Sequence, residues 1–71
     1  MMSSLISKNA LKHYIKLGRA GDHEIQYQLG LYYEKQQDHD LAIYWMRIAH
    51  LGGYASATLW LIQNHISLND L

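Results

Sequence analysis

Residues 22–53 read DHEIQYQLGLYYEKQQDHDLAIYWMRIAHLGG, and two apolar patterns of helical spacing flank their polar centre, residues 36–38. The first pattern comprises Ile25, Leu29, Tyr32 and Tyr33, and the second comprises Leu41, Ala42, Trp45, Ile48 and Ala49. Asp22 and Asp38 each precede one pattern, where an aspartate caps a helix N-terminus well. The stretch therefore predicts two helices joined by a short turn, which makes them antiparallel neighbours.

The chain on either side of this hairpin continues the helical spacing. Leu5, Leu11, Tyr14, Ile15 and Leu17 predict a helix over about 4–17, and Ala55, Leu59, Ile62 and Ile66 predict another that ends near 67–69. Glycines at 18, 21, 52 and 53 separate these segments from the hairpin and can end helices through left-handed caps. We expect an all-α fold in which four antiparallel helices form stacked helical hairpins in one domain, residues 1–71.

A weak internal repeat supports the stacking. A shift of 32 residues places Ala10 on Ala42, Leu11 on Ile43 and Tyr14 on Met46, and it also aligns Gly21 with Gly53, Ile25 with Ala57 and Leu29 with Leu61. Periods of this size are typical of helical hairpins that stack on one another.

One full repeat, about residues 22–53, resembles the Sel-one-like repeat of the tetratricopeptide superfamily. The resemblance rests on Leu29-Gly30-x-x-Tyr33 followed by Ala42-x-x-Trp45-x-x-x-Ala49 and Gly53. The family usually has a longer, glycine-containing loop where this chain has Gln36-Gln37-Asp38. The resemblance implies that the first helix of each hairpin lines a groove for a protein partner. On this chain those partner-binding residues would be Tyr27, Leu31, Glu34, Trp60 and Gln63.

Gly30 lies inside the first helix predicted for this stretch, and the presence of a glycine there needs a physical reason. Glycine inside a helix costs about 1 kcal/mol relative to alanine. We expect a second helix to pass close to Gly30, with Ala42 and Ala49 as its small partners.

Composition limits the function. The 71 residues contain no cysteine, so disulfides and thiolate metal sites are excluded. The formal net charge is zero, which disfavours nucleic acid as the main partner. Polar residues interrupt the N-terminal region, which fits neither a signal peptide nor a membrane span, and we expect a cytoplasmic protein without a membrane partner.

Chemistry-bearing residues show no catalytic pattern. The five histidines never form the short spacing of a helical zinc site, and nothing resembles a nucleophile elbow, so we expect no enzyme, metal or other cofactor. Lys8, Lys12, Lys16 and Arg19 form a basic stripe. The stripe is either the solvated face of an amphipathic helix or a contact for an acidic partner or nucleic acid.

Six tyrosines and two tryptophans without one phenylalanine favour a surface that is buried on association. We therefore expect a protein-protein interaction module with an adaptor, immunity or phage-type inhibitor role and no small-molecule substrate. A small nucleic-acid-binding or regulatory protein that uses the Lys8–Arg19 stripe is the alternative. Both ends of so short a stack should expose apolar surface, which predicts a homodimer through Leu59, Ile62 and Ile66 of the last helix.

Overall fold

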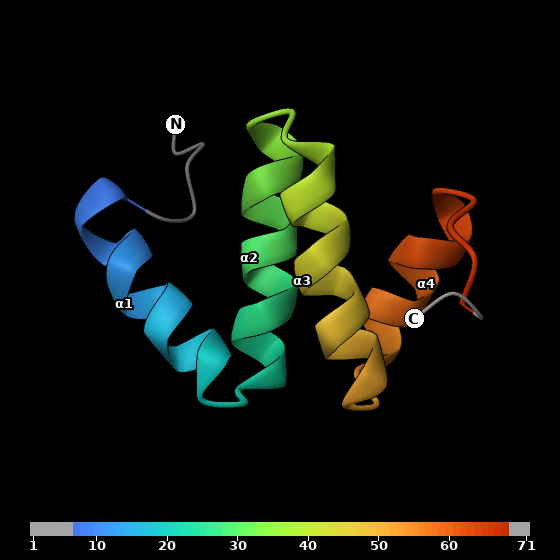
Figure 1. Ribbon diagram of the computed structural model, residues 1–71, viewed down its shortest axis with the longest axis horizontal. Coiled ribbons are helices and arrows are strands. Elements are labelled where there is room, and N and C mark those ends of the chain that lie inside the picture. The colour runs from blue at the N-terminus through green and yellow to red at the C-terminus, as the bar shows by residue number, and fades with distance from the viewer. Residues whose placement is uncertain (1–6, 69–71) are drawn as a thin grey trace.

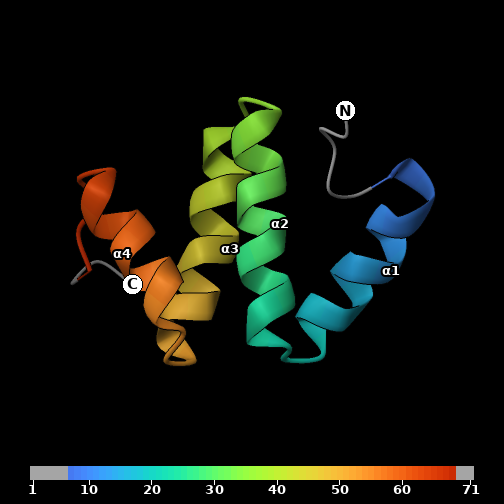
Figure 2. The same cartoon turned by 180° about the vertical axis from the view of Figure 1, so that it is seen from behind.

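The computed structural model describes residues 7–68, and these residues form four helices and no strand. The helices are α1 (Lys8–Arg19), α2 (His23–Lys35), α3 (His39–Leu51) and α4 (Ala55–Gln63). Successive helices run in opposite directions, with α2 and α3 side by side at the centre and α1 and α4 splayed outward at the two ends (Figures 1 and 2). The all-α fold of antiparallel helices is thus confirmed.

The helix starts follow from side-chain caps. The carboxylate of Asp22 accepts a hydrogen bond from the Ile25 backbone N–H at 3.1 Å, and that of Asp38 accepts one from Leu41 at 3.2 Å. Both caps were predicted. Helix α1 begins at Lys8, because the Ser7 hydroxyl accepts a bond from the Ala10 N–H at 3.2 Å. The start expected near residue 4 lies outside the described residues.

The helix ends share one geometry. Each helix is followed by a residue with positive φ: Gly21, Gln37, Gly53 and His65. The N–H of the next residue then bonds back five residues, as in Asp22 to the Leu17 carbonyl at 3.2 Å and Ile66 to the Leu61 carbonyl at 2.9 Å. The last helix therefore ends at Gln63 rather than near 67–69, and the chain after it turns back so that Ile66 and Leu68 pack on the core.

The close crossing predicted at Gly30 is present. A Cβ atom added there would lie 2.7 to 2.9 Å from atoms of the Met46 side chain. Ala42 and Ala49, the expected small partners, are fully buried one turn to either side of Met46 on α3. The alanines let the two helices approach, and Met46 fills the space that the glycine leaves.

Two groups of buried side chains hold the four helices together. Leu29 and Trp45 join α1 to the central pair, since residues of α1 such as Leu11 and Ile15 pack against them. The second group joins α4 to α2 and α3 and consists of Ala42, Met46, Ala49, Ala57, Trp60 and Leu61. Burial of these side chains is the main stabilising term.

Candidate protein-binding surfaces

The groove expected between α2 and α4 is largely closed. Tyr27 and Leu31 are half-buried against the second core group, and the ring of Tyr27 lies 5.3 Å from that of Tyr54. Glu34 is also half-buried, and only Gln63 among the five predicted residues is exposed. Most of this predicted surface is therefore occupied by contacts within the chain.

Trp60 requires a correction. Its side chain is 8% exposed, and its indole N–H donates a hydrogen bond to the Glu34 carboxylate at 3.1 Å. The expectation that Trp60 presents its ring to a partner is thus wrong. The tryptophan joins α4 to α2, because its apolar ring lies in the core and its polar edge reaches Glu34.

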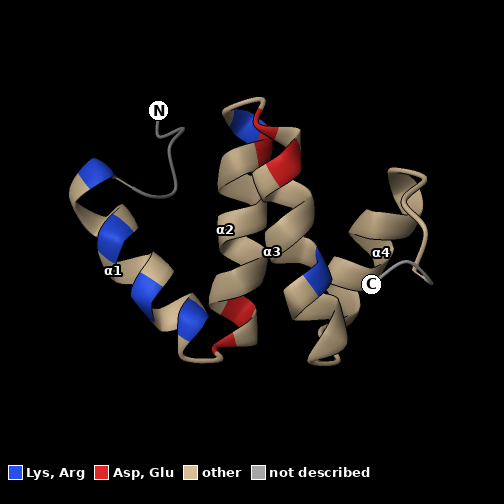
Figure 3. Cartoon of the chain, viewed as in Figure 1, with Lys and Arg blue, Asp and Glu red and all other residues tan. Residues whose placement is uncertain are grey.

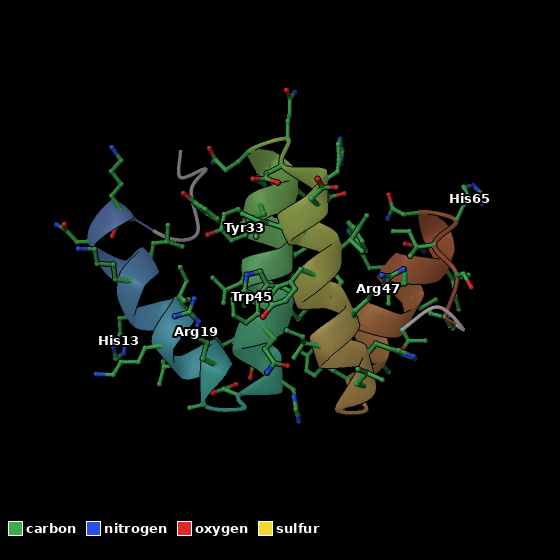
Figure 4. All side chains as sticks on the ribbon, in the orientation of Figure 1. His13, Arg19, Tyr33, Trp45, Arg47 and His65 are labelled. Carbon is green, nitrogen blue, oxygen red and sulfur yellow. The ribbon has the colours of Figure 1, made fainter. Side chains whose placement is uncertain are left out.

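A different concavity lies between α1 and α3, above the C-terminal half of α2. We call it the α1–α3 groove. It has a volume of about 430 Å³ and is lined by Ile15, Arg19, Tyr33, Asp40, Leu41, Tyr44 and Trp45. Figure 4 labels Arg19 of α1, Tyr33 of α2 and Trp45 of α3, three of the residues that line this groove.

The floor and the rim of this groove differ in exposure. Trp45 is buried, and its ring reaches close to Gly18 of α1, so it forms part of the floor. Tyr44 packs edge-on against Trp45, with the ring centroids 5.2 Å apart, yet it is 52% exposed. Leu41, one turn earlier, is 39% exposed. The α3 side of the groove thus presents a leucine and a tyrosine that residues 7–68 cover only in part.

Charges stand on both sides of the groove. Arg19 comes from α1, Asp40 from the first turn of α3, and both side chains are exposed. Basic residues follow α1 along its whole length, and acidic residues lie both at the upper end of the central pair and at the start of α2, where Asp22 and Glu24 stand (Figure 3). The groove therefore has one basic and one acidic edge.

Tyr33 is the titratable group of the groove whose pKa is clearly shifted. Burial raises the pKa of Tyr33, and the nearby Tyr32 and Asp38 raise it further. All three causes keep the hydroxyl protonated. Tyr33 is therefore a neutral groove residue.

The outer face of α4 is the other open apolar surface. Leu59 is 56% exposed and Ile62 is 53% exposed, whereas Ile66 is half-buried against the core. Helix α4 contains no charged residue. Of the three residues predicted for an oligomer interface, Leu59 and Ile62 are accessible and Ile66 is partly occupied.

Residues 7–68 contain no group of three or more His, Asp and Glu side chains arranged to hold a metal ion. No helix in the same range is long and apolar enough to cross a membrane. Comparison with known protein families, with curated proteins and with solved structures gives no match.

Sequence reasoning missed the α1–α3 groove because the resemblance directed attention to the opposite pair of helices, α2 and α4. A signal was nevertheless present. Leu41 and Tyr44 are apolar residues at i and i+3 beside Trp45, and one helix face rarely has room to bury all of them. Which of them stays exposed depends on the outward tilt of α1, which no local pattern encodes.

Proposed function

We propose that this chain is a protein-interaction module and that the α1–α3 groove is its binding surface. The observation that carries the proposal is the partly exposed pair Leu41 and Tyr44 beside the buried Trp45, which forms part of the groove floor. Exposed apolar surface rimmed by polar residues marks binding sites, and tyrosine is favoured where a surface alternates between water and a partner.

Helix-bounded grooves bind amphipathic helices by their apolar positions i, i+3, i+4 and i+7. The α1–α3 groove has an apolar lining that includes Ile15, Leu41 and Trp45 and is suited to such a segment. The roles open to a module of this kind are those of an adaptor or an inhibitor of its partner. We propose a non-enzymatic role, since the residues that line the groove include no serine, cysteine, histidine or lysine. A cytoplasmic location fits a chain without cysteine.

The test uses a synthetic amphipathic helix of about 14 residues with leucines on one face and glutamines elsewhere, added to ¹⁵N-labelled protein. We expect amide shift changes to centre on Ile15, Arg19 and residues 41–45. The Tyr44→Ser variant should weaken binding, and the Leu51→Ser variant should not. Leu51 is the matched control, because it is 69% exposed and lies outside the groove. Shift changes centred elsewhere, or equal effects of the two variants, would contradict the proposal.

A second proposal concerns self-association through the outer face of α4. Leu59 and Ile62 are about half exposed on a helix without charges, so two copies can meet there without like-charge repulsion. A two-fold contact uses the same patch twice and forms a closed dimer. The melting temperature should then rise with protein concentration, and Ile62→Asp should abolish that dependence. Ile66→Asp is a poorer test, because Ile66 also packs on the core.

The Lys8–Arg19 stripe supports a nucleic-acid-binding function as the alternative. All four cations are exposed on one helix, which is the electrostatic footprint of such proteins. The acidic edge at Asp40 and the zero net charge of the chain favour a protein partner instead.

A further inference from the structure

We infer that the partner segment of the α1–α3 groove is an acidic amphipathic helix whose acidic edge lies along α1. This inference rests on the proposed function and adds the charge and orientation of the ligand. Three features of the structure carry it: the face on which the α1 cations lie, their lack of ion pairs within residues 7–68, and the acid on the opposite rim.

The first feature is the continuity of the basic stripe with the groove wall. Ile15 and Arg19 line the groove from α1. Residues at i, i+4, i+7 and i+11 share one helix face, so Lys8 and Lys12 lie on the same face as this pair. Figure 3 shows the basic positions of α1 in a row along one side of the helix. The basic surface of α1 therefore continues beyond the groove, from Lys8 to Arg19, over about 16 Å along the helix axis.

The second feature is that these cations form no ion pair within residues 7–68, although Asp22 and Glu24 follow α1 at the start of α2. Helix α1 itself contains no aspartate or glutamate. Glu34, by contrast, accepts a hydrogen bond from Trp60 at the other side of the molecule. The positive charge of α1 is thus available to a partner.

The third feature is the acid across the groove. Asp40 lines the α3 rim, and Asp38 caps the same helix two residues earlier. A ligand that is acidic on both edges would be repelled by Asp40. A helix with acids on one edge fits when that edge faces α1. The same acid disfavours single-stranded nucleic acid, whose backbone carries negative charge throughout.

Exposed charges of this kind orient and steer a ligand more than they tighten its binding. The apolar floor would supply most of the affinity, through residues such as Tyr44 and Trp45. The α1 cations would select among amphipathic helices by their charge. The expected signature is a modest, salt-sensitive preference for an acidic ligand.

The experiment compares three synthetic helices of about 14 residues with the same leucine face. One edge of each helix carries glutamates, glutamines or lysines. We expect the glutamate peptide to bind at least about threefold more tightly than the glutamine peptide, and the lysine peptide more weakly than both. The differences should vanish near 0.5 M salt, where the screening length falls to a few ångströms.

A charge reversal on the protein tests whether the preference for the glutamate peptide comes from α1. Lys12→Glu should remove the preference for the glutamate peptide and leave the glutamine peptide unaffected. Lys35→Glu is the control, because it makes the same change at an exposed site on α2, outside α1 and the groove lining. Circular dichroism melts of both variants verify the fold.

Each outcome has one meaning. Equal affinity for the three peptides, with shift changes in the groove, overturns the acidic-ligand inference and leaves the proposed function standing. No shift change in the groove with any peptide overturns both. Binding of a single-stranded oligothymidylate that Lys12→Glu weakens, without peptide binding, supports the nucleic-acid alternative and contradicts both proposals.

Discussion

Helices α1 and α4 occupy opposite ends of the stack, and each packs mainly on one neighbouring helix, α1 on α2 and α4 on α3. Their outer surfaces differ. Helix α1 exposes Asn9, His13 and Lys16 on its outer side and turns Leu11 and Ile15 inward, whereas Lys8 and Lys12 lie on the flank next to the groove. Helix α4 has no charged residue and leaves Leu59 and Ile62 about half exposed. One end of the stack is therefore a polar cap and the other is an apolar surface.

The expectation that both ends expose apolar surface finds support at α4, whereas at the other end it rested on Leu5 and Ile6, which lie outside the described residues, and on Leu11, which is half-buried. Stacked hairpins need an end helix that is apolar on one face and polar on the other. Helix α1 meets this requirement and α4 does not. An open head-to-tail chain of copies would have to pair α4 with the cations of α1, so the asymmetry favours a two-fold contact between α4 helices.

The largest expected change in the free energy of unfolding comes from a substitution on the buried face of α4, compared with one on its exposed face. Leu61 is fully buried and Ile62, its neighbour, is 53% exposed. Leu61→Ala should lower the free energy of unfolding by about 2–5 kcal/mol through lost burial and a cavity. Ile62→Ala should change it by less than about 1 kcal/mol in dilute protein. Urea denaturation at low concentration measures both, and similar losses would show that α4 does not pack as described.

The next largest loss of stability is expected from a substitution in α2, which other helices cover on both sides, compared with a substitution at the equivalent position of α4. Gly30→Leu would push a side chain into Met46 and should destabilise the fold by about 1–3 kcal/mol. Met46→Ala should recover part of that loss in the double variant, because it clears the same space. Ile62 occupies the equivalent position 32 residues later, and Ile62→Phe should be tolerated there. A Gly30→Leu protein that melts at or above the wild-type temperature would refute the close crossing.

The N-termini of α1 and α4 should differ by a smaller amount of stability, because only one of them has a side-chain cap. Ser7 caps α1 by a hydrogen bond, whereas Tyr54 at the start of α4 makes no side-chain cap bond. Ser7→Ala should cost about 1 kcal/mol of stability. Ser56→Ala, an exposed serine in the first turn of α4, is the matched control and should stay within about 0.5 kcal/mol. Thermal melts followed by circular dichroism compare the two, and equal losses would argue against a specific cap.

The smallest expected difference in stability concerns the residues of positive φ that follow α1 and α4. Gly21 follows α1 with φ of 108°, and His65 follows α4 with φ of 60°. Because glycine adopts positive φ without steric cost, His65→Gly should stabilise the protein by on the order of 0.5 kcal/mol. Gly21→Ala should destabilise it. A destabilising His65→Gly substitution would show that the histidine side chain contributes more than its backbone strain removes.

Local signals explain which parts of the fold were predictable. Helices α2 and α3 begin at aspartate caps and carry dense apolar patterns, and their starts and their crossing at Gly30 follow from the sequence. The end of α4 does not. It depends on His65 in a conformation that usually indicates glycine, and on the Asn64 side chain, which donates a hydrogen bond to the Trp60 carbonyl at 2.8 Å.

The candidate site was less predictable, because exposure is set by packing over long sequence separations. From the sequence, Trp60 resembles an exposed residue that anchors a partner. In the structure its indole N–H donates a hydrogen bond to Glu34, 26 residues earlier. Two further contacts link neighbouring helices of the stack. The Gln26 amide donates to the Gly18 carbonyl at 2.8 Å, and His50 pairs with Thr58 at 2.6 Å. These pairs occupy positions 32 residues apart, yet they use different chemistry, which sequence comparison alone does not reveal.

Sedimentation equilibrium at high micromolar concentration tests the contrast between the two ends most directly. The wild-type chain, Ile62→Asp and Lys12→Asp would be measured side by side. Ile62→Asp places a charge on the apolar end, and Lys12→Asp alters charge on the end that is already polar. We predict a dimer mass for the wild type and Lys12→Asp and a monomer mass for Ile62→Asp. A monomeric wild type, or a dimer that Lys12→Asp dissociates and Ile62→Asp does not, would contradict this account.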